Sequence, residues 1–131
     1  MAKTEKRKKA PKLPKQIAQA IAAAEDKQAL ELQVLDLRKA GGFTDYFLIC
    51  SGSNSRQVRA IADGITDALA AAGEKPSHIE GYQSSEWILL DYFDFIVHVF
   101  APETRAFYGL ERLWGDAEPV RAGADESPAE D

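Results

Sequence analysis

The spacing of hydrophobic positions changes along the chain and predicts an alternation of helices and strands. Residues 15–28 carry an apolar stripe at helical spacing, which predicts a helix. Alternating or continuous apolar runs predict strands over 31–38 and 45–52, joined by a turn at Gly41–Gly42. The second of these runs is apolar enough to be buried on both faces. Three more strands are predicted over 78–81, 86–91 and 94–100.

The longest helical stripe lies between Ser53 and Gly73. Its apolar positions recur every three or four residues and form one face, made of Val58, Ile61, Ile65, Leu69 and Ala72. Ser53 or Asn54 is placed to cap the start of this helix, and Gly73 is placed to end it.

A last helix is predicted from Pro102 to the residue before Gly115. Proline suits a first helical turn, and Phe107, Leu110 and Trp114 share one face of this helix. The order of helices and strands predicts an α+β fold in which a mixed β-sheet is flanked by helices.

The predicted hairpin of residues 86–91 and 94–100 has two unlike faces. A turn centred on residues 92–93 pairs Trp87 with His98, Leu89 with Ile96, and Asp91 with Asp94. Side chains alternate along a strand. One face therefore carries Trp87, Leu89, Ile96, His98 and Phe100, and the other carries Ile88, Leu90, Phe95, Val97 and Val99. The second face is purely apolar, as expected of a face covered by helices.

Two interpretations of the first face remain open. An indole beside an imidazole is typical of a binding surface, because both rings have polar atoms that need partners when buried. Trp87 is then an anchor, worth at most roughly 4–6 kcal/mol if about 150–250 Å² is buried at about 25 cal/mol per Å². Alternatively, the last helix covers this face and His98 is a core histidine with satisfied hydrogen bonds.

Charge divides the chain into three parts. Residues 1–15 carry a net charge of +6, residues 16–115 carry −6 and residues 116–131 carry −5, which together give the net charge of −5. We predict a basic disordered arm over 1–14, one folded domain over 15–115 and an acidic disordered tail over 116–131. The acidic domain does not favour nucleic acid, whereas the Lys-rich arm either solubilises the chain or makes a peripheral contact with RNA.

Composition and cysteine content indicate a cytoplasmic protein that is not bound to membranes. Hydrophobic residues make up 45% and charged residues 28% of the chain. No apolar run reaches the roughly 18 residues of a membrane span, and the first residues lack the apolar segment of a secretory signal. Cys50 is the single cysteine, so no internal disulfide is available, and we expect it in the core.

Candidate chemistry fails on spacing. His98, His78 and Cys50 do not have the ligand spacing of a zinc site, and a buried Cys50 does not suit a Cys–His nucleophile. The stretch SGSNS, residues 51–55, opens a helix but lacks the lysine and the glycine spacing of a P-loop. Asp91 and Asp94 lie across a turn, unlike the carboxylate pair of a nucleotidyltransferase. We therefore predict no catalytic residue, no metal and no cofactor.

The segment EGYQSSEWILLDYFDFIVHVFAPETRAFYGLERLW, residues 80–114, closely resembles the ribosomal silencing factor family, also called RsfS or Iojap-like. The segment TDYFLICSGSNSRQV, residues 44–58, resembles the strand–turn–helix signature of the same family, so the resemblance covers about residues 15–115. The matching residues of the longer segment are Glu80, Gly81, Trp87, Asp91, Val97, His98, Val99, Phe100, Arg105, Tyr108, Leu110, Glu111, Leu113 and Trp114.

The resemblance implies a nucleotidyltransferase-like α/β sandwich without catalytic carboxylates, and a translation repressor that is not an enzyme. Members of the family bind the large ribosomal subunit through ribosomal protein L-fourteen and sterically block association with the small subunit, mainly under nutrient limitation. Organellar relatives act in large-subunit assembly, and bacterial members are often dimers, so a homodimer is also expected. Tyr82 stands where many relatives have another residue. The alternatives are a nucleotide-binding or nucleotidyltransferase-like enzyme, a large-subunit assembly factor, and an RNA-binding module driven by the arm.

The predicted partner-binding residues combine the first face of the hairpin with its neighbours on the loop and the last helix. Acidic residues among them are expected to steer association with a basic partner. The set is Trp87, Leu89, Asp91, Ile96, His98, Phe100, Tyr82, Glu80, Arg105 and Tyr108.

Overall fold

The computed structural model describes residues 14–39, 44–109 and 118–120, and these form one mixed sheet with helices against it. The six-stranded sheet has the order β3-β4-β5-β2-β1-β6. Its strands are β1 (Leu30–Asp36), β2 (Tyr46–Ser51), β3 (His78–Glu80), β4 (Trp87–Asp91), β5 (Phe95–Phe100) and β6 (Glu118–Val120). The helices are α2 (Lys15–Asp26), α3 (Ser55–Ala71) and α4 (Pro102–Tyr108). The predicted α+β class with a mixed sheet is confirmed.

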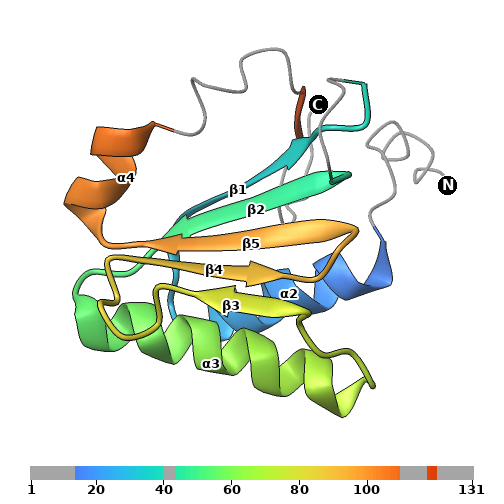
Figure 1. Ribbon diagram of the computed structural model, residues 1–131, viewed down its shortest axis with the longest axis horizontal. Helices are drawn as coiled ribbons and strands as arrows, with labels where there is room; N and C mark the ends of the chain where they lie inside the picture. The colour runs from blue at the N-terminus through green and yellow to red at the C-terminus, as the bar shows by residue number, and fades with distance from the viewer. Residues whose placement is uncertain (1–13, 40–43, 110–117, 121–131) are drawn as a thin grey trace, which may run out of the picture.

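Both long helices lie on the same face of the sheet. Figure 1 shows α2 and α3 side by side beneath the strands, whereas α4 leaves the carboxyl end of β5. β2 and β5 run parallel, and the other paired strands are antiparallel. The parallel pair lies at the centre of the sheet, and β2 is buried along its whole length, as its continuous apolar run predicts.

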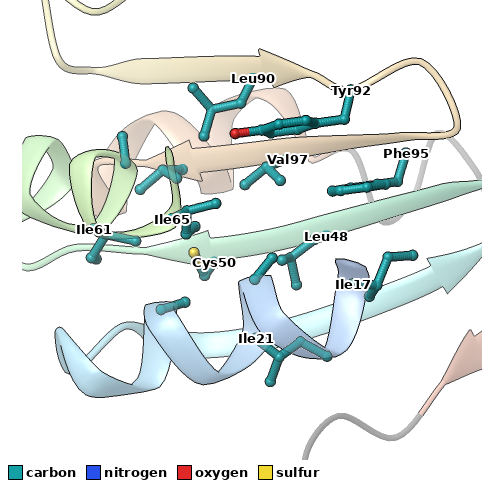
Figure 2. Packing of buried hydrophobic residues seen from close by; sticks show 14 of the residues in the cluster. Ile17, Ile21, Leu48, Cys50, Ile61, Ile65, Leu90, Tyr92, Phe95 and Val97 are labelled. Carbon is teal, nitrogen blue, oxygen red and sulfur yellow. The ribbon is translucent and has the colours of Figure 1, made fainter. Parts of the chain in front are cut away.

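The main hydrophobic core fills the space between the sheet and the two long helices. Figure 2 shows Ile17 and Ile21 of α2 and Ile61 and Ile65 of α3 meeting the strand side chains, among them Cys50. Cys50 has no exposed surface, and burial raises the pKa of its thiol to about 12. The thiol therefore stays protonated and behaves as a small apolar core residue, as predicted.

Local sequence signals explain the ends of α3. The side chain of Asn54 accepts a hydrogen bond from the backbone N–H of Gln57 at 2.9 Å, which caps the helix as predicted. The apolar stripe from Val58 to Leu69 is buried, but Ala72 lies past the last helical residue and is exposed. Gly73 follows with a φ of +87°, a conformation that glycine adopts without steric cost.

The register of the β4–β5 hairpin differs from the prediction by two residues. Trp87 lies opposite Phe100, Leu89 opposite His98 and Asp91 opposite Ile96. The reversal is centred on Phe93–Asp94, one position later than predicted, since Tyr92 and Phe95 are still hydrogen-bonded to each other. The predicted pairs Trp87–His98, Leu89–Ile96 and Asp91–Asp94 are therefore wrong. The membership of the two faces is unchanged, because a shift of two residues preserves the alternation.

The carboxyl-terminal part departs from the prediction in two places. Gly109 adopts the left-handed conformation and caps α4 after Tyr108, whereas the sequence predicts a longer helix. Glu118–Val120 form β6 on the edge of β1, so the sheet includes three residues that were assigned to the acidic tail. Several predicted features lie outside the described residues: residues 1–13 of the basic arm, the turn at Gly41–Gly42, Leu110, Trp114 and Gly115, and the rest of the tail.

Candidate protein interface

The face of the sheet opposite α2 and α3, which includes the first face of the predicted hairpin, carries an accessible apolar stripe along β4. Along this strand Ile88 and Leu90 are buried under the helices, whereas Trp87, Leu89 and Asp91 are half-buried and point to the other side. We call these three residues, Trp87, Leu89 and Asp91, the β4 face. It brings a large aromatic ring, an aliphatic side chain and a carboxylate into one line at every second position.

The short strand β3 adds a charged rim beside the β4 face. Glu80 lies opposite Leu89, and His78 lies opposite Asp91 in the antiparallel pairing. Both rim residues are exposed, and the Nε2 atom of His78 lies 2.5 Å from a carboxylate oxygen of Glu80. An apolar centre with a polar, solvent-accessible rim is the usual anatomy of a protein–protein interface.

Strand β5 lies beside β4 in the sheet, and its side chains on the same side of the sheet pack against the β4 face. Ile96, His98 and Phe100 lie opposite Asp91, Leu89 and Trp87, and they are 3%, 3% and 0% exposed. The indole of Trp87 lies against the ring of Phe100, with the ring centroids 5.0 Å apart. These three residues were predicted to contact a partner. They are instead buried neighbours that pack beside the accessible residues within the same sheet.

A hydrogen bond between the two rings orients Trp87. The Nε1–H of Trp87 donates to Nδ1 of His98 at 3.0 Å, although the two residues are not directly paired. Phe47 closes over the imidazole from the other side with a centroid distance of 4.5 Å. The predicted contact between indole and imidazole is therefore present, and it is a diagonal contact across the hairpin.

Burial keeps His98 neutral. Desolvation lowers the pKa of its imidazole to about 3, so the ring is uncharged at neutral pH. Because Nδ1 accepts the indole proton, the ring proton lies on Nε2. Nε2 is buried and has no hydrogen-bond partner among the described residues. The prediction of an imidazole exposed to a partner is wrong, and His98 contacts Trp87 beneath the surface.

The loop before β4 is tied to α3 by contacts that sequence analysis missed. Ser85 is fully buried with a φ of +61°, its hydroxyl donates to the carbonyl of Tyr82, and it accepts a hydrogen bond from Arg59. The Tyr82 hydroxyl donates to both carboxylate oxygens of Asp63 at 3.1 Å. The polar run QSSE marks a loop, but nothing in it distinguishes the buried serine.

Gly81 is required where this loop starts. Its φ is +78°, and a Cβ atom there would lie 2.0 Å from the carbonyl oxygen of Trp87. The Glu80–Gly81 pair, which carried part of the family resemblance, therefore has a steric reason. Tyr82 itself is 37% exposed, so its ring borders the surface while its hydroxyl is engaged within the chain.

Arg105 and Tyr108 are the two predicted partner-binding residues on the last helix. One guanidinium nitrogen of Arg105 donates to the carbonyl of Glu31 at 2.8 Å and to the hydroxyl of Ser51 at 3.0 Å. Arg105 thus fastens α4 to the ends of β1 and β2. Its contact with a partner stays a prediction. The side chain of Tyr108 lies outside what the structure describes, so its role stays a prediction too.

A shallow groove lies elsewhere, in the helical layer between α2 and α3. It is lined by small residues and a few charged ones, namely Gln19, Ala22, Ala23, Asp26, Lys27, Gly64, Asp67 and Ala68. No predicted site residue is among them. Across the described part of the chain, no group of three or more His, Cys, Asp or Glu side chains is placed to hold a metal ion. No described helix is long and apolar enough to cross a membrane.

The fold and this surface define an α+β protein whose candidate site is a protein interface on the sheet. The family model described as "Ribosomal silencing factor during starvation" matches residues 10–131. The chain is 46% identical over 91 residues to the "Ribosomal silencing factor RsfS" of Zymomonas mobilis, which covers 70% of this chain and 68% of the relative. It is 43% identical over 98 residues to the protein of the same name from Bacillus subtilis, covering 75% of this chain and 83% of that one. The chain belongs to the ribosomal silencing factor family.

Solved structures and a more distant relative agree with this assignment. A crystal structure of a Chromobacterium violaceum protein superposes with a TM-score of 0.76 at 32% identity, covering 88% of this chain and 98% of that chain. A Mus musculus protein named "Mitochondrial assembly of ribosomal large subunit protein 1" is 30% identical over 89 residues, or 66% of this chain and 39% of the relative. The predicted family and its organellar branch are thus both found among the relatives.

Proposed function

We propose that this chain is a translation repressor that binds the large ribosomal subunit through ribosomal protein L-fourteen and sterically blocks association with the small subunit, mainly under nutrient limitation. Family membership associates the chain with the ribosome and with the silencing of translation. The name of the mouse relative supports the large subunit as the binding partner. The role requires a binding surface and no catalysis, so we propose that the protein is not an enzyme and acts in the cytoplasm.

The observation that carries this proposal is the β4 face. Its apolar members remain partly accessible on the side of the sheet that α2 and α3 do not cover, and the acidic rim of β3 lies beside them. A ribosomal protein that binds RNA is basic, so Asp91 and Glu80 are suited to steer its approach. We propose Trp87, Leu89 and Asp91 as the central contacts, with Glu80 and Tyr82 at the rim.

The half-buried state of Trp87 limits its contribution. A further burial of about 80 Å² at about 25 cal/mol per Å² is worth about 2 kcal/mol, or roughly a 30-fold change in affinity. This is smaller than the value expected for a fully exposed tryptophan. The contribution is favoured by the fixed orientation of the ring, because the hydrogen bond to His98 reduces the entropy lost on docking.

The test is co-sedimentation with separated ribosomal subunits and with purified ribosomal protein L-fourteen. The parent protein should pellet with large subunits only, and its addition should reduce the formation of complete ribosomes from mixed subunits. Trp87→Ala should weaken large-subunit binding by about 30-fold. Trp87→Phe preserves the packing on Phe100 and separates loss of the anchor from loss of the fold.

Leu30→Ala is the control, because Leu30 is a hydrophobic residue that is 45% exposed but lies on β1, away from the β4 face. It should bind like the parent. A parent protein that ignores large subunits, or a Trp87→Ala protein that is folded and binds unchanged, would contradict the proposal. A large-subunit assembly role is the second candidate, supported by the name of the mouse relative. It predicts binding to precursor subunits without an effect on subunit joining.

A further inference from the structure

Phe93, at the tip of the β4–β5 hairpin, is the most exposed of the large hydrophobic side chains described, at 78%. Single exposed hydrophobic residues are common and need no explanation by themselves. Phe93 differs because its backbone has a φ of +76°, in the region that favours glycine. The backbone is therefore strained at the same position where the chain exposes a phenyl ring.

The turn geometry shows why this conformation is fixed. The backbone N–H of Asp94 donates to the carbonyl of Tyr92 at 2.9 Å, which together with the φ of Phe93 makes the strained form of the three-residue γ-turn. The N–H of Phe93 donates to the carboxylate of Asp91 at 2.8 Å, and its carbonyl accepts the hydroxyl proton of Thr44 at 2.8 Å. Both backbone groups of Phe93 are thus engaged.

The inner side of the turn is already filled by other rings. Tyr92 and Phe95 stack on each other with their centroids 5.0 Å apart and their planes within 11°. Figure 2 shows both rings within the core layer between the sheet and the helices. Phe93 is left outside this stack, with its backbone fixed by the turn and its ring in solvent. Because the backbone is already fixed and an aromatic side chain has only two rotatable bonds, little conformational entropy is lost when a partner covers the ring.

Charge around the turn indicates the kind of partner. Asp91 binds the N–H of Phe93, Asp94 is the next residue, and the backbone N–H of Asp45 donates to the carbonyl of Asp94 at 3.0 Å. None of these three aspartates takes part in an ion pair with another residue of the described segments. Carboxylates beside an aromatic ring repel phosphate and attract a lysine or arginine, whose charge also interacts favourably with the ring face.

We propose that Phe93 is a second anchor, which receives a lysine or arginine side chain of the same basic protein that docks on the β4 face. This inference rests on the proposed function and extends its surface from β4 to the hairpin tip. The two parts are continuous, because Asp91 belongs to the β4 face and its carboxylate also holds the turn at Phe93. The strain of the turn is thereby linked to binding and not to folding.

The test exploits the opposite signs expected for folding and binding. Phe93→Gly removes the ring and relieves the positive φ, so the melting temperature should stay equal or rise by a few degrees. Affinity for large subunits and for purified ribosomal protein L-fourteen should fall by about 5- to 10-fold. Phe93→Tyr keeps an aromatic ring at the same φ and should bind like the parent. Asp94→Asn should reduce the salt dependence of binding.

The possible results distinguish a failure of this inference from a failure of the proposed function. A parent protein that binds large subunits while Phe93→Gly binds equally well would overturn the second anchor and leave the β4 face intact. A parent protein that does not bind overturns both proposals. If Phe93→Gly loses affinity for protein-free ribosomal RNA but not for the purified ribosomal protein, the partner chemistry proposed here is wrong. Leu30→Ala again serves as the control for an exposed hydrophobic residue outside the surface.

Discussion

The two faces of the sheet are built from the same strands but are organised differently. On the helical face, α2 and α3 contribute isoleucines that meet the strand side chains in a continuous apolar cluster (Figure 2). On the opposite face, the cluster contains no helix residue among the residues described: Leu35, Leu37, Phe47, Ile49, Ile96 and Phe100, with Trp87 and Leu89 packed against it. The helical face holds the fold together, whereas the opposite face also has accessible residues.

The two faces differ most clearly in the polar atoms that each of them buries. The helical core has few, and its buried thiol stays protonated because burial raises the pKa of Cys50. The other face buries an imidazole and uses it to hold an indole. A polar group in a dry layer costs free energy unless it is paired, so its presence indicates a need for orientation that packing alone does not supply.

The largest expected effect comes from replacing one leucine on each face with alanine, in two separate variants. Leu48 is completely buried in the helical core, and Leu48→Ala should lower the free energy of unfolding by about 2–5 kcal/mol. Leu89 is half-buried on the β4 face, and Leu89→Ala should cost less than about 1.5 kcal/mol of stability while weakening large-subunit binding. Urea unfolding and co-sedimentation measure the two effects. Equal stability losses would show that the faces do not differ in this way.

A smaller effect should appear in the dependence of stability on pH. The pKa of His98 is lowered to about 3 in the folded state from an ordinary value of 6.5, so between these values the unfolded chain binds the additional proton. The stability contributed by the neutral ring is fully present above about pH 6.5 and is lost as the pH falls, by up to about 1.4 kcal/mol per unit. From pH 7 to pH 5 the loss should be about 2 kcal/mol.

His98→Asn isolates this contribution, because its amide oxygen can accept the indole proton and its side chain does not titrate in this range. The variant should show a flatter pH profile than the parent in urea unfolding at pH 5, 6 and 7. Subtracting one profile from the other removes the contributions of the titratable groups that both proteins share. Parallel profiles would mean that the imidazole is accessible to protons in the folded state.

Sequence analysis found the two faces but not the register that joins them. Alternation along β4 and β5 assigns every residue to its correct face, since that assignment depends only on parity. The register depends on the turn, and a γ-turn at Phe93 places a non-glycine residue at positive φ, which no propensity rule favours. The prediction centred the turn one position early and mispaired the hairpin.

Exposure and polar partners were the least predictable features of the candidate site. Whether a residue of the face opposite the helices is accessible depends on its strand's place in the sheet: His98 is on β5, a central strand, while Trp87 is on β4, next to the short edge strand β3. Strand order requires the parallel pairing of β2 with β5, which joins segments distant in sequence. The ties of Ser85 to Arg59 and of Arg105 to Ser51 are likewise long-range and carry no local signal.

The smallest effect concerns the hydrogen bond between Arg59 and Ser85, which connects the two faces around the edge of the sheet. Arg59 on α3 donates to the buried Ser85, two residues before Trp87, so the helical layer holds the loop that leads into the β4 face. Arg59→Ala should lower the free energy of unfolding by about 1 kcal/mol and speed amide hydrogen exchange in residues 82–86 by about 5-fold. Affinity for large subunits should fall by about 2- to 3-fold, because Trp87 is less well oriented before docking. Arg56→Ala, which removes an exposed arginine from the first turn of the same helix, is the matched control and should change none of these. If Arg59→Ala lowers stability but leaves both exchange in the loop and binding unchanged, the helical layer supports the fold alone, and the β4 face is organised by β5 without it.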